Sequence, residues 1–149
     1  MPDKYNLKRF VDAQEDCYAQ ALAEINAGHK HSHWMWYIFP QVQGLGRSAT
    51  ARYYAIRSRD EARAYLNHAL LGRRLRECAQ CLRKQEGMTA RQIFGSPDDL
   101  KLKSCMTLFD AVAGGESVFA AVLDQYYNGK RDGSTLAILS RDGGEVDSD

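Results

Sequence analysis

Apolar residues recur at helical spacing over most of this 149-residue chain, and this pattern constrains the fold more than any other feature. Near the start, spacings of three and four places put one stripe on one helix face. Its members are Leu7, Phe10, Val11, Gln14, Tyr18, Leu22 and Ile25. Gly28 follows the stripe, and glycine accepts the left-handed conformation that ends many helices. We therefore expect one first helix that ends just before Gly28.

Cap residues mark the starts of further helices. Ser48 is suited to cap a helix over residues 49–56, and Ser58-Arg59-Asp60-Glu61 is typical of a capping box. Asn67 is a good cap for a helix that continues to about residue 85. Ser96-Pro97-Asp98-Asp99 is the clearest start, with a capping serine, a proline at the first helical position and acids in the first turn.

These signals predict an all-α fold, a compact bundle of six or seven helices with one long aromatic loop. By its length, the chain is expected to form a single helical domain over residues 1–140. Residues 141–149 form an acidic tail that we expect to be disordered.

The aromatic loop covers residues 29–48 and has no helical period. It contains both tryptophans, three of the four histidines, Pro40, Gly44 and Gly46, which favour an irregular path with an extended stretch around residues 34–39. Structured loops of this length are rarely plain connections in a compact domain. The loop is therefore the leading candidate for a functional site.

One hypothesis for this loop is an anion site. Gly44-Leu45-Gly46-Arg47-Ser48 leads directly into a predicted helix, and free backbone N–H groups beside Arg47 and Arg52 suit a phosphate or carboxylate. Trp34 or Trp36 could stack on a ring, and His33 could act as a general acid or base. The alternative is that the tryptophans only cover the core and the glycines only shape a turn.

A second polar group lies on the helix that follows Pro97. Asp98, Lys101, Ser104 and Thr107 are three or four places apart and share one face. Lys101 and Ser104 could hold an anion, or the face could be solvated, with an Asp98–Lys101 pair. The spacing alone does not say whether this face meets the 29–48 loop.

Other chemistries find less support. His29, His31 and His33 alternate, but no neighbouring carboxylate or cysteine completes a metal site. Cys78 and Cys81 have redox spacing but lie inside a predicted helix, so we expect buried thiols. No metal is predicted, and the cofactor stays unknown.

The charge and the cysteine content limit which binding partners and which cellular compartment are expected. A net charge of +1 argues against a nucleic-acid partner or a membrane surface, although arginines outnumber acids over residues 47–91. The polar start of the chain and four free cysteines are typical of a cytoplasmic protein.

Several motifs together resemble the signature of domain-of-unknown-function family 1810. They are His33-Trp34-Met35-Trp36-Tyr37-Ile38-Phe39-Pro40-Gln41, Gly44-Leu45-Gly46 with Ser48, Leu71-Gly72 with Arg74-Leu75, Ile93-Phe94-Gly95 with Pro97-Asp98-Asp99, and Met106-Thr107-Leu108-Phe109. The resemblance covers nearly the whole chain. It implies a compact, mainly helical bacterial domain, and it implies no established reaction, cofactor or catalytic residue.

Two functions remain open. The first is binding of an anionic, ring-bearing small molecule such as a nucleotide or an ADP-ribose derivative, by residues Trp36, Gln41, Gly44, Gly46, Arg47, Ser48, Lys101 and Ser104, with His33 as the acid or base if the protein is an enzyme. The second is a non-catalytic protein-interaction module that uses an exposed aromatic patch of Trp34, Trp36 and Tyr37. A pocket that holds His33 and Arg47 would favour the first, and a flat aromatic patch the second.

Overall fold

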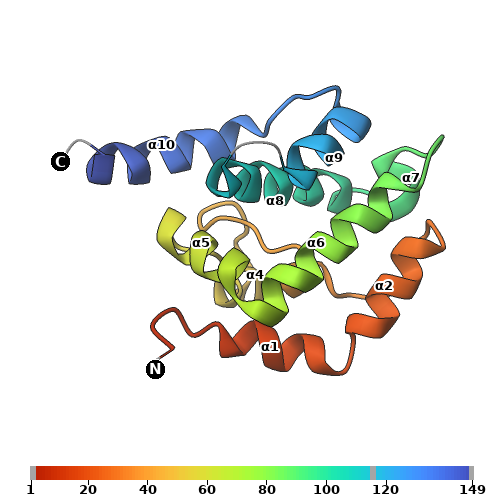
Figure 1. The fold of residues 1–149 in the computed structure, drawn as a ribbon, viewed down its shortest axis with the longest axis horizontal. Coiled ribbons are helices and arrows are strands. Elements are labelled where there is room, and N and C mark those ends of the chain that lie inside the picture. The colour runs from red at the N-terminus through yellow and green to blue at the C-terminus, as the bar shows by residue number, and fades with distance from the viewer. Residues whose placement is uncertain (1–2, 115–116, 148–149) are drawn as a thin grey trace.

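The fold is all-α, as predicted (Figure 1). The computed structural model describes the backbone of residues 3–114 and 117–147 and the side chains of these residues up to Arg141. This part contains ten helices, more than the six or seven expected. They are α1 (Lys8–Glu15), α2 (Tyr18–Asn26), α3 (Met35–Ile38), α4 (Ala49–Tyr53), α5 (Arg59–Asn67), α6 (Ala69–Arg83), α7 (Ala90–Phe94), α8 (Asp98–Ala113), α9 (Val118–Tyr127) and α10 (Gly133–Asp147).

Helix α8 lies at the centre and packs against α5, α7, α9 and α10 (Figure 1). Helix α6 packs against α1, α2, α5 and α9 on the other side of the core. A row of buried rings runs through the core from α1 through α5 and α8 to α9. The ring of Tyr65 lies 5.0 Å from that of Phe10 and 5.2 Å from that of Phe109, and Phe109 lies 6.0 Å from Phe119. Aromatic side chains bury large apolar areas, so this row contributes strongly to the packing.

Two local departures contribute to the higher helix count, in addition to α10. The N-terminal stripe does not form the single predicted helix, because the chain leaves helical geometry at Cys17 (φ −130°, ψ −6°) between α1 and α2. The stretch around residues 34–39 is not extended as predicted either, because residues 35–38 form the single turn α3. Gly28 has the predicted positive φ, +73°, just after α2.

Two of the four predicted caps at helix starts are confirmed. The Ser48 hydroxyl accepts a hydrogen bond from the backbone N–H of Ala51, and the Ser58 hydroxyl accepts one from Glu61. The Glu61 carboxylate, however, does not complete a capping box, because it binds Arg57 N and the Arg9 guanidinium instead. Helix α4 ends at Tyr53, three residues earlier than predicted.

Two predicted caps are wrong. Asn67 ends α5, and the adjacent His68 caps α6 because its Nδ1 accepts hydrogen bonds from the backbone N–H groups of Leu70 and Leu71, each at 3.2 Å. Ser96 does not cap α8: Pro97 occupies the cap position, and no side chain bonds the first turn.

The C-terminal helix α10 covers the region where a disordered tail was expected. Its backbone is helical as far as Asp147, whereas side chains beyond Arg141 and residues 148–149 lie outside the described part. The disorder of residues 141–149 therefore stays a prediction. No helix of the described residues is both long and apolar enough to cross a membrane.

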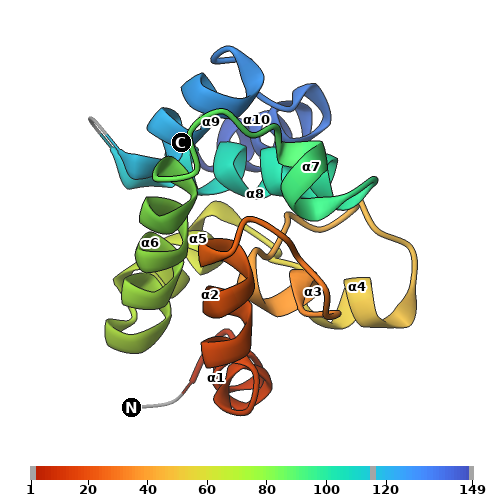
Figure 2. The same ribbon diagram turned by 90° about the vertical axis from the view of Figure 1, so that its right-hand side faces the viewer.

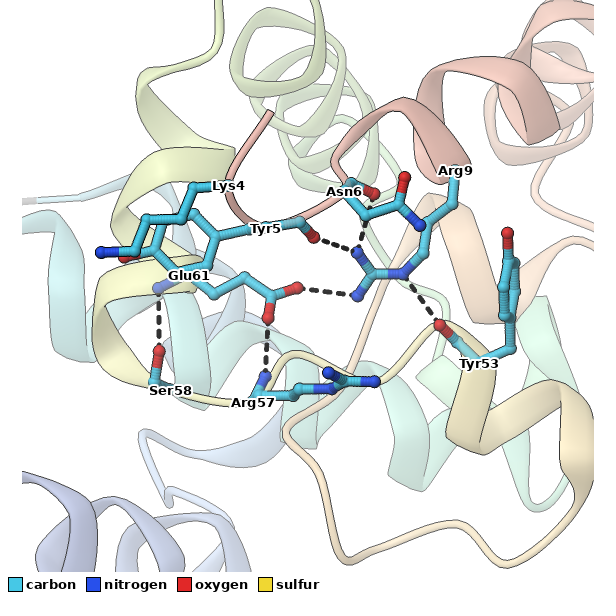
Figure 3. Close-up of a pocket in the computed structure, with 8 residues that line it drawn as sticks. All are labelled: Lys4, Tyr5, Asn6, Arg9, Tyr53, Arg57, Ser58 and Glu61. Atoms are coloured by element: carbon cyan, nitrogen blue, oxygen red, sulfur yellow. Dashed lines mark hydrogen bonds and ion pairs between the residues drawn. The ribbon is translucent and has the colours of Figure 1, made fainter. Parts of the chain in front are cut away.

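One buried cation joins the N-terminal helix to the middle of the chain (Figure 3). The Arg9 side chain is 5% exposed, and its guanidinium donates five hydrogen bonds, equal to its number of N–H groups. The acceptors are the carbonyl oxygens of Tyr5, Asn6, Tyr53 and Ala55 and the carboxylate of Glu61, at 2.7–2.9 Å. Because every donor is satisfied, the burial of this charge is compensated.

We expect Glu61→Gln to lower the free energy of unfolding by about 3 kcal/mol, because it leaves the buried Arg9 guanidinium without a counter-charge. Asp60→Asn is the matched control: it breaks the exposed Asp60–Arg63 pair and should cost less than about 1 kcal/mol. Urea denaturation measures both. Equal losses in the two variants would show that the buried pair has no special weight.

Candidate functional site

The start of the aromatic loop is held by a buried carboxylate on α2. Glu24 accepts hydrogen bonds from the backbone N–H groups of His31 and Ser32, the Ser32 hydroxyl and the Trp34 indole N–H, at 2.7–3.0 Å. Burial by itself raises the pKa of this carboxyl, but the hydrogen bonds outweigh it and lower the pKa from 4.5 to about 2. Glu24 therefore stays ionised and fixes the path of residues 31–34.

An ion pair to α8 also fixes the start of the aromatic loop. The side chain of Lys30 is 8% exposed, and its Nζ lies 2.9 Å from Asp98 at the start of α8. Asp98 also pairs with Lys101 at 3.5 Å, as the spacing of these two residues predicted.

The proposed aromatic patch is not an exposed surface. Trp34 is 1% exposed, and its ring lies 6.2 Å from that of Phe39 and 6.3 Å from that of Phe94. Trp36 and Tyr37 are half-buried. The prediction of an exposed patch is therefore wrong for Trp34, because the Glu24 hydrogen bond draws its indole into the core. This removes the main anchor of the interaction-module hypothesis.

The end of the loop is closed by an isolated parallel bridge between Val42 and Ile56. Gln43 N donates to the Ile56 carbonyl at 2.8 Å, and Ile56 N donates to the Gln41 carbonyl at 2.9 Å. The bridge gathers residues 42–56, which include α4, into one closed loop beside α3 (Figure 2). Residues far apart in this segment are thereby brought to one surface.

The first hollow on this surface, the arginine hollow, has a volume of about 550 Å³. Three of the candidate site residues, Gly44, Gly46 and Arg47, line it. The full lining is Gln43, Gly44, Gly46, Arg47, Arg52, Ala55 and Arg57. The three arginines are exposed, and none has an ion-pair partner among the side chains that the structure describes. No acidic residue lines the hollow.

The second hollow, the lysine hollow, has a volume of about 180 Å³ and brings the aromatic loop to the face that follows Pro97. It is lined by Gln41, Leu45, Gly46, Pro97, Leu100, Lys101, Ser104, Asp132 and Ser134. The spacing could not establish whether the candidate residues of the aromatic loop meet those that follow Pro97. In the structure they do, because Gly46 lines this hollow together with Lys101 and Ser104 and also lines the arginine hollow. Asp98 already pairs with Lys101, and a second acid, Asp132, lines the hollow. This hollow is therefore less suited to an anion.

The polar face after Pro97 is also less available than its spacing suggested. Ser104 and Thr107 are buried, and their hydroxyls donate to the carbonyls of Leu100 and Lys103, four residues earlier. Thr107 also accepts from Asp132 N. The hypothesis of a solvated stripe is therefore wrong for these two residues, because their hydroxyls are used within the fold.

Trp36 lines a third hollow, with Gln41, Val42, Gly46, Ala51, Tyr54 and Ala55. Its volume is about 20 Å³, which is enough for a single water molecule and too small for an aromatic ring. The Lys101 ammonium lies 5.8 Å from the centre of the Trp36 ring, within the range of a cation–π contact. This hollow therefore has no room for a ligand ring to stack on Trp36.

The remaining candidates lie outside these hollows. His33 is exposed and lines none of the three. The Ser48 hydroxyl caps α4, which has only five residues and too few aligned peptide dipoles to act as an anion site. The structure thus brings Gly44, Gly46 and Arg47 together, but not His33 with Arg47.

The sequence argument missed Arg57. Arg47, Arg52 and Arg57 are five places apart, which is neither a helix nor a strand period, so no pattern indicated a shared surface. Their meeting depends on the Val42–Ile56 bridge. The local excess of arginine over residues 47–91 was the one available signal.

The cysteines are free and most are buried, as expected. Burial raises the pKa of Cys78 to about 12, so its thiol is not a nucleophile near neutral pH. Among the described residues, no three histidine, cysteine or acidic side chains lie close enough to hold a metal ion.

Two comparisons place the chain among known proteins, and no curated protein matches it. The model of a family described as "Protein of unknown function (DUF1810)" matches residues 4–139. The crystal structure of the conserved hypothetical protein Rv1873 from Mycobacterium tuberculosis is 48% identical, with a TM-score of 0.91, and the match covers 93% of this chain and 99% of that chain. Neither description names an activity or a ligand.

We expect Glu24→Gln to lower the free energy of unfolding by about 2–3 kcal/mol at pH 7, because an amide cannot satisfy all the donors around it. The folded-state pKa of Glu24 lies below its unfolded value, so this stabilisation is full above about pH 4.5 and is lost as the pH falls toward 2. The gap between wild type and variant should therefore close over that range.

Urea unfolding at several pH values measures this gap. Glu15→Gln, which changes an exposed acid on α1, is the control and should show no comparable gap. A wild-type advantage over Glu24→Gln that is the same at pH 3 and pH 7 would contradict an ionised Glu24.

Proposed function

We propose that this chain, which belongs to the DUF1810 family of proteins of unknown function, binds an anionic, ring-bearing small molecule such as a nucleotide or an ADP-ribose derivative. The observation that carries the proposal is the arginine hollow. Three guanidinium groups surround a volume of about 550 Å³, within the usual range of small-molecule sites.

The charges around this hollow support an anionic ligand. Elsewhere in the described chain, buried charged groups such as Arg9, Glu24 and Lys30 have partners of opposite charge or several hydrogen bonds. Arg47, Arg52 and Arg57 have no ion-pair partner among the described side chains. Guanidinium groups bind phosphate and carboxylate through paired N–H donors, and several at one site strengthen the attraction.

The backbone supports the same ligand. Gly44 has a φ of +102°, a conformation that other residues rarely adopt, and this shapes the turn at the edge of the hollow. At Gly46 a β-carbon would lie 2.5 Å from that of Ala51, so glycine is required where the loop passes α4. Both positions let the backbone come close to a ligand held by the arginines.

Two neighbouring hollows adjoin the arginine hollow, and either could receive the part of the ligand that carries the ring. One is the lysine hollow, which lies past Gly46 toward Gln41, Lys101 and Ser104. The other lies past Arg57 toward Tyr53. The proposal concerns binding and includes no role for His33, which lines neither hollow. A cytoplasmic location is part of the proposal and is supported by the free cysteines.

A thermal-shift screen tests this function with nucleotides, NAD, ADP-ribose and phosphorylated sugars. A ligand at a hundred times its dissociation constant stabilises a fold by about 2.7 kcal/mol, which raises the Tm of a chain of this size by about 5–10 °C. Arg47→Ala should remove most of this shift, because it deletes one of the three cations.

Arg73→Ala is the matched control, since Arg73 is an exposed arginine on α6 outside the hollow, and it should keep the full shift. The proposal fails if no member of the panel raises the Tm, or if Arg47→Ala responds as the wild type does.

A further inference from the structure

Arg57 lines a fourth hollow in addition to the arginine hollow, so the two adjoin at this side chain. We call it the tyrosine hollow; it has a volume of about 330 Å³ and lies between the N-terminal segment and the chain that follows α4 (Figure 3). Its floor is the buried Arg9–Glu61 pair, and its sides are Lys4, Tyr5, Asn6, Tyr53, Arg57 and Ser58.

The floor of this hollow carries little free charge. All five N–H groups of Arg9 are bonded within the protein, and Glu61 is neutralised by Arg9. A ligand group in this hollow therefore meets a floor with no unsatisfied ion. The floor itself can therefore receive a neutral, flat group, while the cations Lys4 and Arg57 line the sides of the hollow.

Tyr53 offers this hollow an aromatic face. Its side chain is 55% exposed, although large apolar groups are usually covered. The ring is held in place by Tyr54, whose ring meets it edge-on at 4.8 Å and 81°. Figure 3 shows the Arg57 side chain extending toward Tyr53, so these two residues lie on the same side of the hollow.

The two hollows that hold Trp36 and Lys101 are less suited to a ring. The hollow beside Trp36 has only about 20 Å³. The lysine hollow has about 180 Å³, and Gln41, Lys101, Ser104, Asp132 and Ser134 make much of its lining polar or charged. The tyrosine hollow is larger than both, at about 330 Å³, and it holds the more exposed aromatic face.

Asn6 adds a means of recognition. It lines the tyrosine hollow, and its side-chain amide has no hydrogen-bond partner among the described residues. An amide presents one donor and one acceptor side by side, which matches the edge of a nitrogen heterocycle such as adenine.

We infer that the ligand is a nucleoside phosphate whose base stacks on Tyr53 in the tyrosine hollow, while its phosphate is held by Arg47, Arg52 and Arg57 in the arginine hollow. This inference rests on the proposed anion site and adds the position of the ring. Arg57, which lines both hollows, is the contact between the two halves of the ligand.

Titration calorimetry with AMP and ribose 5-phosphate tests the position of the ring, because these probes differ only in the base. The wild type should bind AMP at least about tenfold more tightly, the usual effect of stacking one base on an aromatic side chain. Tyr53→Ala should reduce AMP binding to the level of ribose 5-phosphate and leave ribose 5-phosphate unchanged. Tyr53→Phe should keep the preference, since the ring is retained.

Further variants separate this inference from the proposed function. Arg57→Ala should weaken both probes, because both carry the phosphate. Circular dichroism confirms the fold of each variant; Tyr53 is exposed and its carbonyl, which accepts from Arg9, is unchanged by the substitution.

Equal binding of AMP and ribose 5-phosphate to the wild type would overturn the ring position and leave the anion site standing. So would a preference for AMP that survives in Tyr53→Ala but is lost in Trp36→Ala. Failure of the wild type to bind either these probes or any member of the thermal-shift panel would overturn both proposals.

Discussion

The burial of the Arg9 guanidinium is the constraint on which the candidate site depends. A buried cation is tolerated only when its charge and all its donors are matched. Arg9 meets this condition by binding the carbonyls of Tyr53 and Ala55 on one side and Glu61 on the other. Glu61 in turn binds the backbone N–H of Arg57. The positions of Tyr53 and Arg57, and so of two adjoining hollows, follow from this one side chain on α1.

A buried anion plays the matching part at the other end of the aromatic loop. Glu24 binds two backbone N–H groups, a hydroxyl and an indole, so residues 31–34 have one path and Trp34 belongs to the core. Lys30 adds an ion pair to α8. The aromatic loop is therefore ordered by charges that lie beneath it, and its tryptophans contribute to stability before they contribute to any surface.

This arrangement also explains how a nearly neutral chain presents a basic site. The chain has 20 basic and 19 acidic residues, so composition alone indicates no anionic partner. In the structure, several charges are used in the fold, as in the Arg9–Glu61 and Lys30–Asp98 pairs. The arginines of the closed loop over residues 42–56, with Arg57 beside it, are left facing solvent. Local charge, rather than net charge, decides what such a surface attracts.

The sequence by itself determined the features that depend on neighbours within about four residues. The helical stripes, the Ser48 and Ser58 caps, the positive φ at Gly28 and the Asp98–Lys101 pair were all predicted from spacing and side-chain chemistry. The family resemblance also followed from the motifs alone. Local failures arose where two adjacent residues competed for one role, as Asn67 and His68 did for the cap of α6.

Only the tertiary structure decided what depends on distant pairing. The Val42–Ile56 bridge brings three arginines to one surface. Glu61 binds Arg9, which lies 52 residues away, instead of completing the predicted capping box. The hydrogen bond to Glu24 holds the Trp34 indole in the core. The physical reason is that a buried polar group must find its partner wherever the packed chain supplies one. Helical spacing describes one face of one element, and it carries no information about which elements that face will meet.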